Sequence, residues 1–219
     1  MNNYTNFDRY LSQLQQDIYP QKQDMAHTAW ALDSLAMIPP DVEVILDVGC
    51  GEGFLKEPIE AQERVWNGLT LGKRDWEVGR KKGRSGLYHG DFTFTNFQDG
   101  MFDMVYARHA LEHSPFPILT LMEWHRIAAK YLLLIAPAPE FWGYIGQNHY
   151  AVGNEDQVWW WLRRSGWKIF RRKYLRTDDA RFLVTYRPEE EDRDTVEHPG
   201  APMIVEYRYL CKKVEPVAT

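Results

Sequence analysis

The stretch VILDVGCGEGF, residues 44–54, decides which fold this chain adopts. Its first half is apolar apart from Asp47, as in a strand that is buried on both faces of a sheet. Its second half places Gly49, Gly51 and Gly53 at alternate positions. Glycines directly after a buried strand are typical of a turn in which the backbone approaches a ligand closely.

Strand and helix patterns alternate along the chain on both sides of this turn. The expected strands are 42–48, 65–71, 86–92, 101–107, 131–138, 167–175 and 203–213, and the expected helices among them are 52–62, 74–83, 117–130 and 155–166. Such alternation predicts an α/β fold, a Rossmann-like doubly wound sheet of about seven mostly parallel strands. The last two strands have no helix between them, so we expect an antiparallel C-terminal hairpin strand.

The two segments before the first strand carry apolar residues at helical spacing, over 7–18 and 24–37. We therefore divide the chain into an N-terminal helical extension, residues 1–40, and a main domain, residues 41–219. The extension is a candidate lid over a substrate pocket, although packing against the sheet is an equal alternative. Its candidate wall residues are Tyr10, Tyr19 and Trp30.

The composition is that of an ordinary globular domain, with 44% hydrophobic and 26% charged residues. The net charge of −5 argues against a surface that coats nucleic acid. The N-terminus lacks the order of a signal peptide, and no run approaches 18 apolar residues, so we expect a cytoplasmic protein without membrane contact. Cys50 and Cys211 lie far apart and are expected to be buried thiols.

The glycine turn does not fit a dinucleotide or a phosphate. A dinucleotide fingerprint needs a sixth-position glycine, where this chain has Phe54, and no Lys followed by Ser or Thr is present for a phosphate loop. The carboxylates of Asp47 and Glu52 would repel a polyphosphate. They suit a ligand that carries an ammonium and a sulfonium.

At this point the sequence resembles the class I S-adenosylmethionine (SAM)-dependent methyltransferases. ILDVGCGEG, residues 45–53, is similar to their first motif, and four further segments follow in the family's order: HGDF (89–92), FDMVYARHALEHSPFP (102–117), LTLMEWHRIAAKYLLLIAPAP (119–139) and NHYAVGNEDQVWWWLRRSGWKI (148–169). The resemblance implies an enzyme that moves a methyl group from SAM to an oxygen or nitrogen of a small-molecule acceptor. S-adenosylhomocysteine (SAH) would be the second product.

The resemblance also assigns cofactor contacts to residues at the ends of strands. It places the glycine turn against the methionine and ribose parts of SAM, an acidic residue near the ammonium, and a second acidic residue on the adenine amino group. In this chain those positions are Asp47, Gly49, Cys50, Gly51, Gly53, Asp91, Phe92 with its backbone amide on the adenine ring, and Ala107 and Arg108 near the amino-acid part of SAM.

One position departs from the family. An acidic residue usually ends the second strand and binds both ribose hydroxyls, whereas GLTLGKRD, residues 68–75, has Thr70 there, followed by Leu71. A similar GLTLS occurs in the cyclopropane-fatty-acid-synthase branch, where the threonine and a residue five positions later contact the ribose. We therefore expect Thr70 and Asp75 to replace the missing acid, although Asp75 could equally be a surface helix residue.

Three histidines fall where the family fold places strand ends and the substrate loop: His109, His113 and His149. They are the candidate catalytic residues, as a general base for a hydroxyl acceptor or as acceptor contacts, and a structural role is open for each. No metal site is expected, because the neighbours Glu112 and His113 do not easily turn both side chains toward one ion.

Other functions are weighed by their motifs. DNA adenine and cytosine methylation are disfavoured, because YARHA follows the fourth strand in place of the loops and Pro-Cys nucleophile those reactions need. Lipid modification is disfavoured, because the sequence has no counterpart for the residues that, together with the Glu-His segment, bind bicarbonate in the cyclopropane-fatty-acid-synthase branch. An RNA or protein methyltransferase stays open because of the basic stretch 72–84, and so does a non-catalytic SAM-binding module. The oligomeric state is not indicated.

Overall fold

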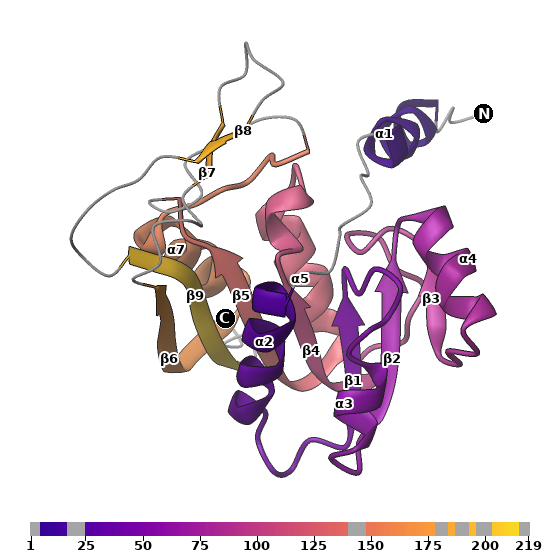
Figure 1. Cartoon of the computed structure of the whole chain (residues 1–219), viewed down its shortest axis with the longest axis horizontal. Helices are drawn as coiled ribbons and strands as arrows, with labels where there is room; N and C mark the ends of the chain where they lie inside the picture. Colours follow the sequence, from indigo (N-terminus) through magenta and orange to yellow (C-terminus); the bar gives the residue numbers. More distant parts are fainter. Residues whose placement is uncertain are drawn as a thin grey trace, which may run out of the picture.

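The computed structural model describes residues 5–16, 25–139, 148–177, 184–186, 193–195 and 203–214. Seven strands form one sheet in the order β3-β2-β1-β4-β5-β9-β6, and a separate pair joins β7 to β8 (Figure 1). The strands are β1 Val44–Val48, β2 Val65–Thr70, β3 Leu87–His89, β4 Phe102–Arg108, β5 Ala128–Pro137, β6 Trp167–Thr177, β7 Val184–Tyr186, β8 Arg193–Thr195 and β9 Met203–Lys213.

The strand directions confirm the predicted doubly wound sheet. The first five strands pair in parallel, whereas β9 is antiparallel to both β5 and β6. In the register of the sheet, Val48 lies opposite Leu69 of β2 and Ala107 of β4. The carboxyl ends of β1, β2 and β4 therefore meet at one edge. The chain reverses its strand order at β1, so this edge is where ligands bind in such folds.

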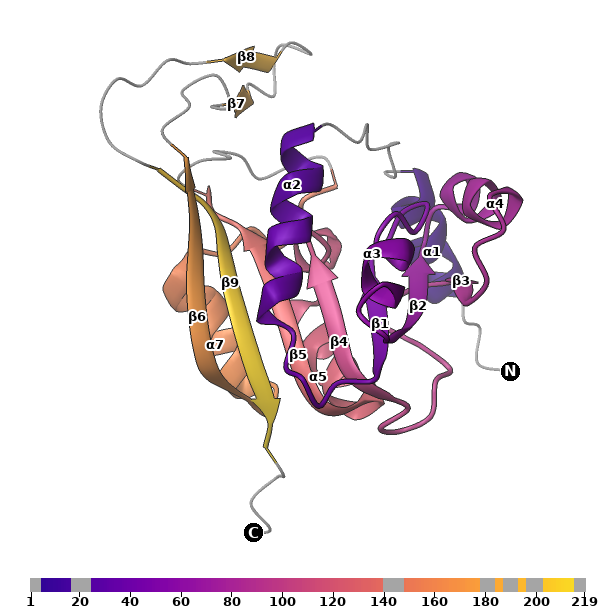
Figure 2. The same cartoon turned by 60° about the horizontal axis from the view of Figure 1, so that its bottom comes forward.

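Helices cover both faces of the sheet (Figure 2). They are α1 Thr5–Gln16, α2 Met25–Ser34, α3 Lys56–Glu60, α4 Lys73–Lys81, α5 Pro117–Ile127 and α7 Glu155–Arg164, with short 3₁₀ turns η1 Leu35–Met37 and η2 Leu111–His113. Among the helices that the structure describes, none combines the length and apolar character needed to span a bilayer.

Successive residues of each buried strand point alternately into two hydrophobic cores, one on each face of the sheet. Leu46 and Val105 face the helices α5 and α7, while Ile45 and Met104 face α2 and α3. Trp124 of α5 is fully buried in the first core, and its indole nitrogen donates to the Phe92 carbonyl oxygen at 3.0 Å. This alternation follows from the period of two in an extended chain.

The N-terminal helices differ in how they pack. Ala31 of α2 is buried in the second core, and the hydroxyl of Ser34 bonds that of Tyr106 in β4 at 2.9 Å. α1 instead lies over the carboxyl edge of the sheet, where Tyr10 contacts the rings of Phe94 and Phe116. α2 is thus part of the main core, and only α1 is placed as a lid would be. Tyr19 lies outside the described residues.

Two expected elements are shorter than predicted. The helix expected over 52–62 is confined to Lys56–Glu60, because positive φ angles at Gly51 and Gly53 turn the chain before it can become helical. The strand expected over 86–92 ends at His89. Asp91 stops it, since its Oδ1 accepts hydrogen bonds from the amides of Thr93 and Phe94 at 2.7 and 2.9 Å.

Candidate active site

The glycine turn after β1 exposes bare backbone at the edge of the sheet. Gly49, Gly51 and Gly53 have φ of +72°, +54° and +80°, the left-handed region that favours glycine. The amides of Gly49 and Cys50 both donate to the Leu69 carbonyl oxygen, at 2.9 and 3.2 Å, which ties the turn to the end of β2. A Cβ on Gly49 would lie 2.9 Å from the Cβ of Ala110, so no side chain fits there.

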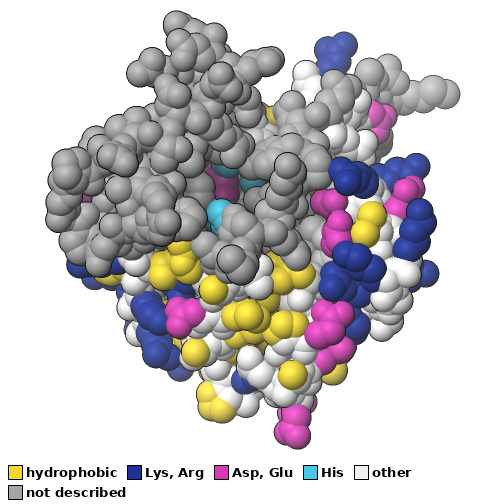
Figure 3. All heavy atoms as spheres, in the orientation of Figure 1, with side chains coloured by type: hydrophobic (Ala, Val, Ile, Leu, Met, Phe, Trp, Pro, Cys, Tyr) yellow, Lys and Arg dark blue, Asp and Glu magenta, His cyan; other side chains and the backbone are white. Residues whose placement is uncertain are grey.

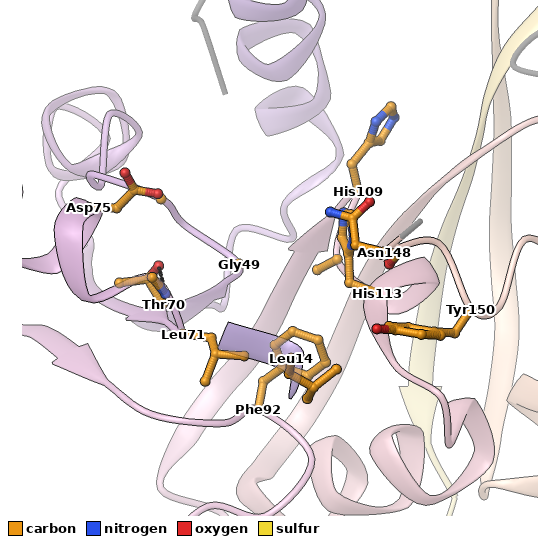
Figure 4. Close-up of a pocket in the computed structure, with 13 residues that line it drawn as sticks. Leu14, Gly49, Thr70, Leu71, Asp75, Phe92, His109, His113, Asn148 and Tyr150 are labelled. Carbon is orange, nitrogen blue, oxygen red and sulfur yellow. Dashed lines mark hydrogen bonds between the residues drawn. The ribbon is translucent and has the colours of Figure 1, made fainter. Parts of the chain in front are cut away.

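One pocket opens beside this turn and encloses about 800 Å³ of empty space, its open mouth included. Its walls come from α1, the ends of β1 and β2, α4, the segment after β4 and the segment 148–150. They are Leu14, Gly49, Gly51, Thr70, Leu71, Gly72, Asp75, Phe92, His109, Ala110, His113, Asn148 and Tyr150 (Figure 4).

The β2 side of the pocket carries Thr70 and Asp75, on the same side of the close-up (Figure 4). Thr70 ends β2, and its hydroxyl accepts a hydrogen bond from the Gly72 amide at 3.3 Å. Asp75 lies in the first turn of α4, with burial and the nearby Glu52 raising its pKa. A carboxylate and a hydroxyl thus face one end of the pocket, beside Gly51.

Several predicted contact residues lie behind the wall. The buried Asp47 accepts a hydrogen bond at 3.1 Å from the Trp66 indole, and burial raises its pKa to about 7. Cys50, Gly53 and Ala107 are likewise not among the lining residues. The Trp66 ring explains two of these, because it packs under Gly53 and, with the thiol of Cys50, against Gly68.

Arg108 also lies away from the wall, contrary to its predicted place beside the amino-acid part of a cofactor. Its Nη2 lies 2.5 Å from Oε1 of Glu206, a fully buried carboxylate of β9. Burial alone would raise the pKa of Glu206, but the cations around it, Arg108 first, hold that pKa well below its usual range. Glu206 comes 98 residues after Arg108 in the sequence, so no local sequence pattern indicates that the two side chains pair.

The next residue, His109, reaches the pocket in its place. Its φ of +48° is unusual for a side chain larger than glycine, and such backbone strain clusters at functional sites. Its Nε2 lies 3.1 Å from Oε1 of Glu206. Burial, reinforced by the Arg108 cation, lowers the pKa of His109 to about 4, so the imidazole is neutral at physiological pH.

At the adenine end, Phe92 lines the pocket and Asp91 lies beside it. One oxygen of Asp91 caps the following turn, as described above. The Tyr10 hydroxyl of α1 lies close to this carboxylate, and burial together with the Asp91 charge raises the pKa of Tyr10. α1 therefore approaches the pocket over the position predicted for the purine.

The side opposite Thr70 gathers polar groups from two segments. His113 and Asn148 both line the pocket, and Tyr150 follows them (Figure 4). The His113 and His149 rings have centroids 4.7 Å apart. Glu112 is buried beside them, and burial raises its pKa to about 8.

Comparisons with known proteins agree with this geometry. A family model described as a methyltransferase domain matches residues 46–133, from β1 into β5. A ubiquinone biosynthesis O-methyltransferase of Vibrio campbellii is 32% identical over 80 residues, which are 34% of this chain and 34% of that protein. The chain therefore aligns with only about a third of that relative's length.

Solved structures match nearly the whole chain in fold. One is a chain from a complex between the Haloferax volcanii Trm112 methyltransferase activator and a methyltransferase, with a TM-score of 0.69, 15% identity and coverage of 98% of this chain and 99% of that one. Another is a SAM-dependent methyltransferase of Archaeoglobus fulgidus, with a TM-score of 0.67, 14% identity and coverage of 97% and 100%. Residues 46–133 thus match a methyltransferase domain, and nearly the whole chain has the fold of these solved methyltransferases. The local resemblance to the cyclopropane-fatty-acid-synthase branch is not confirmed by these matches.

The pocket fits SAM as a cofactor. The turn at Gly49 and Gly51 offers main chain that no Cβ shields, and Thr70 and Asp75 offer a hydroxyl and a carboxylate at the ribose position. The sequence did not point to Leu14, Asn148 or Tyr150 as lining residues. Asn148 and Tyr150 flank the predicted His149, so their place in the same segment is the signal that would have found them.

Proposed function

We propose that this methyltransferase moves the methyl group of SAM to an oxygen or nitrogen atom of a small molecule. One observation carries the proposal: a single pocket joins the bare backbone of the glycine turn to a group of histidine, amide and phenol side chains on its opposite wall. The first half suits the donor and the second half suits an acceptor. SAM supplies a methyl group on a positively charged sulfur, which the reaction leaves neutral.

Each residue of the donor half would bind a different part of the cofactor. The backbone at Gly49 and Gly51 would hold the methionine and ribose parts, while Thr70 and Asp75 would bind the ribose hydroxyls and Phe92 the adenine. Asp47, held by Trp66 behind the turn, would act on the ammonium through water. Holding the donor in line with the acceptor and excluding water contributes most of such a rate enhancement, up to about 7–11 kcal/mol.

The acceptor half would contain His109, His113 and His149. Each lies within or beside the wall formed by the segment after β4 and residues 148–150. The neutral imidazole of His109, next to Glu206, could accept a proton from an acceptor hydroxyl. An amine acceptor that is already neutral would need only alignment.

Several features favour a small acceptor over RNA or protein. Three of the six basic residues in the stretch 72–84 contact carboxylates: Lys73 contacts Glu77, Lys82 contacts Glu52 and Arg84 contacts Glu57. Positive and negative side chains are interspersed on the α4 side of the molecule (Figure 3). Leu14 of α1 also narrows the pocket. The Vibrio campbellii relative, named for ubiquinone biosynthesis, is itself named as an O-methyltransferase.

The donor site is tested by calorimetry with SAM and SAH. The double variant Thr70→Val with Asp75→Ala is expected to bind SAM at least about tenfold more weakly, roughly 1.4 kcal/mol, because both proposed ribose partners are removed. Glu77→Ala, which removes an exposed carboxylate in the middle of α4, is the matched control and should keep the native affinity. Equal affinity in the double variant would refute the ribose assignment.

Catalysis is tested separately by screening metabolite pools for release of SAH. Production of SAH with a low-molecular-weight pool supports the proposal. Binding of SAM without SAH release in any pool would indicate the non-catalytic SAM-binding module, and release only with RNA or protein fractions would replace the small acceptor by a macromolecule.

We further propose that α1 acts as a lid over the pocket. Removal of residues 1–20 is expected to lower turnover by about tenfold or more, because closure over a site mainly excludes water, and to weaken SAM binding as well, because Tyr10 lies beside Asp91 at the position predicted for the purine. The chain should still fold, since Ala31 and Ser34 of α2 stay in place. Turnover equal to that of the full chain, with an intact circular-dichroism spectrum, would rule out the lid.

A further inference from the structure

Three potential metal ligands converge at the acceptor end of the pocket. One ligand atom each from Glu112, His113 and His149 lies within 4.8 Å of the other two. All three residues lie on the wall opposite the glycine turn or directly beside it. A tetrahedral Zn²⁺ site needs donor separations of about 3.3 Å, so the side chains would have to converge by at most about 1.5 Å.

Backbone hydrogen bonds hold the two segments of this cluster together. The amides of Tyr150 and Ala151 both donate to the Glu112 carbonyl oxygen, at 2.7 and 3.0 Å. This clamp fixes His149 beside the 3₁₀ turn Leu111–His113. No metal is expected from the sequence, because Glu112 and His113 are neighbours. The turn overcomes that objection by directing both side chains toward the third residue.

The orientation of His113 is typical of a metal ligand. Its Nδ1 lies 2.9 Å from the Asn148 carbonyl oxygen, which can only accept, so Nδ1 carries the proton. In the neutral ring the lone pair is then on Nε2. Metal-bound histidines commonly donate their second nitrogen to a backbone carbonyl in this way, which fixes the ring.

The carboxylate of Glu112 supplies the strongest indication of a missing partner. The side chain is 2% exposed, and its Oε2 accepts no hydrogen bond from the part of the chain that the structure describes. Oδ1 of the adjacent buried Asn148 likewise accepts no hydrogen bond from the described residues. Buried polar atoms are nearly always paired, so an orphaned carboxylate oxygen calls for a ligand. Nη2 of the nearby Arg108 is paired with Glu206, while Nε of the same side chain has no hydrogen-bond partner among the described residues.

We propose that Glu112, His113 and His149 bind one divalent first-row transition-metal ion. Two imidazoles and one carboxylate suit Zn²⁺, Fe²⁺ or Co²⁺, whereas Mg²⁺ and Ca²⁺ prefer oxygen ligands. Three protein ligands leave coordination positions open, as in catalytic sites. Those positions face the pocket that His113 and Asn148 line.

The ion would determine the chemical class of the acceptor. This inference rests on the proposed methyl transfer. An acceptor hydroxyl that coordinates a divalent cation loses its proton near neutral pH, so the acceptor class becomes an alcohol or phenol rather than an amine. The hydroxyl proton leaves to water. The new O–C bond forms as the S–C bond of SAM breaks, and the electron pair of that bond stays on the sulfur of SAH.

The test uses the full chain without an affinity tag, stripped with a chelator and titrated with Co²⁺ while its visible absorption is recorded. Zn²⁺ and Mg²⁺ are titrated by calorimetry in parallel. We expect one Co²⁺ or Zn²⁺ per chain and much weaker binding of Mg²⁺. Glu112→Gln and His149→Gln should each weaken binding at least about tenfold, the lower end of what even outer-shell substitutions cost.

His125→Gln is the matched control, because His125 lies on α5 against Trp167 and Val214. It should bind Co²⁺ as the native chain does. If either ligand variant fails to fold by circular dichroism, the other decides. No uptake of Co²⁺ or Zn²⁺, or uptake that neither ligand variant weakens, would overturn the metal site. Titrating SAM into the same samples distinguishes the two proposals. If the chain binds SAM but takes up no metal, only the ion is refuted. If the chain takes up metal but does not bind SAM, only the proposed function is refuted.

Discussion

Replacing Gly49 by alanine is expected to weaken SAM and SAH binding by about 100-fold, roughly 2.7 kcal/mol. Two effects add at this position. The φ of +72° costs an L-residue about 1–2 kcal/mol, and the new Cβ would lie 2.9 Å from the Cβ of Ala110, a distance that real Cβ contacts essentially never show. Relief of the collision must move either the glycine turn or the segment after β4, and both line the pocket.

Gly83→Ala separates the collision from the backbone cost. Gly83 has nearly the same φ, +76°, but a Cβ there would meet nothing within 4 Å. We expect this control to lose about 1 kcal/mol of unfolding free energy, measured in urea, and to bind SAH like the native chain. If Gly49→Ala binds SAH with native affinity while remaining folded, the turn does not hold the cofactor.

The sequence was informative where the chemistry is local. Three alternate glycines after an apolar strand predicted the turn, and the structure gives all three positive φ. The alternation of strands and helices predicted the seven-stranded sheet and its antiparallel last strand, because each element carries its own periodicity. The family resemblance assigned Thr70 and Asp75 to the ribose of the cofactor, and both residues line the pocket.

The sequence was uninformative where the partner of a residue lies far along the chain. Asp47 was expected near the ammonium of the ligand, directly or through water, and the indole of Trp66 holds it behind the turn, which leaves the contact through water. Arg108 was expected at the cofactor, whereas in the structure it pairs with Glu206 of β9. The Arg108 pair depends on which strand becomes the neighbour of β5, and residue spacing does not encode that choice.

The acceptor wall shows the same limit. His113 and His149 were each identified as candidates, yet their contact depends on the amides of Tyr150 and Ala151 reaching the Glu112 carbonyl oxygen. Backbone hydrogen bonds of this kind have no sequence pattern. The expectation of no metal site rested on the sequence neighbours Glu112 and His113, whereas the proposed ion rests on the folded geometry.

Removing the buried cation Arg208 is expected to cost about 3 kcal/mol of unfolding free energy in Arg208→Met, measured by urea denaturation. Arg208 of β9 is fully buried and donates to Glu206 at 3.0 and 3.1 Å, to Asp33 at 2.5 Å and to the Trp30 carbonyl oxygen at 3.0 Å. It thereby joins α2 to the sheet beside the pocket. Arg108 would still compensate Glu206, which places the expected loss at the low end of the range for broken buried pairs.

Lys173→Met provides the matched comparison, since Lys173 pairs with the same Asp33 carboxylate at 3.1 Å from a half-exposed position. Solvent screens that contact, so the expected loss is below about 1 kcal/mol. A loss equally small in Arg208→Met would mean that the buried network adds nothing to stability. In that case Arg108 alone would neutralise Glu206, the carboxylate that lies beside His109.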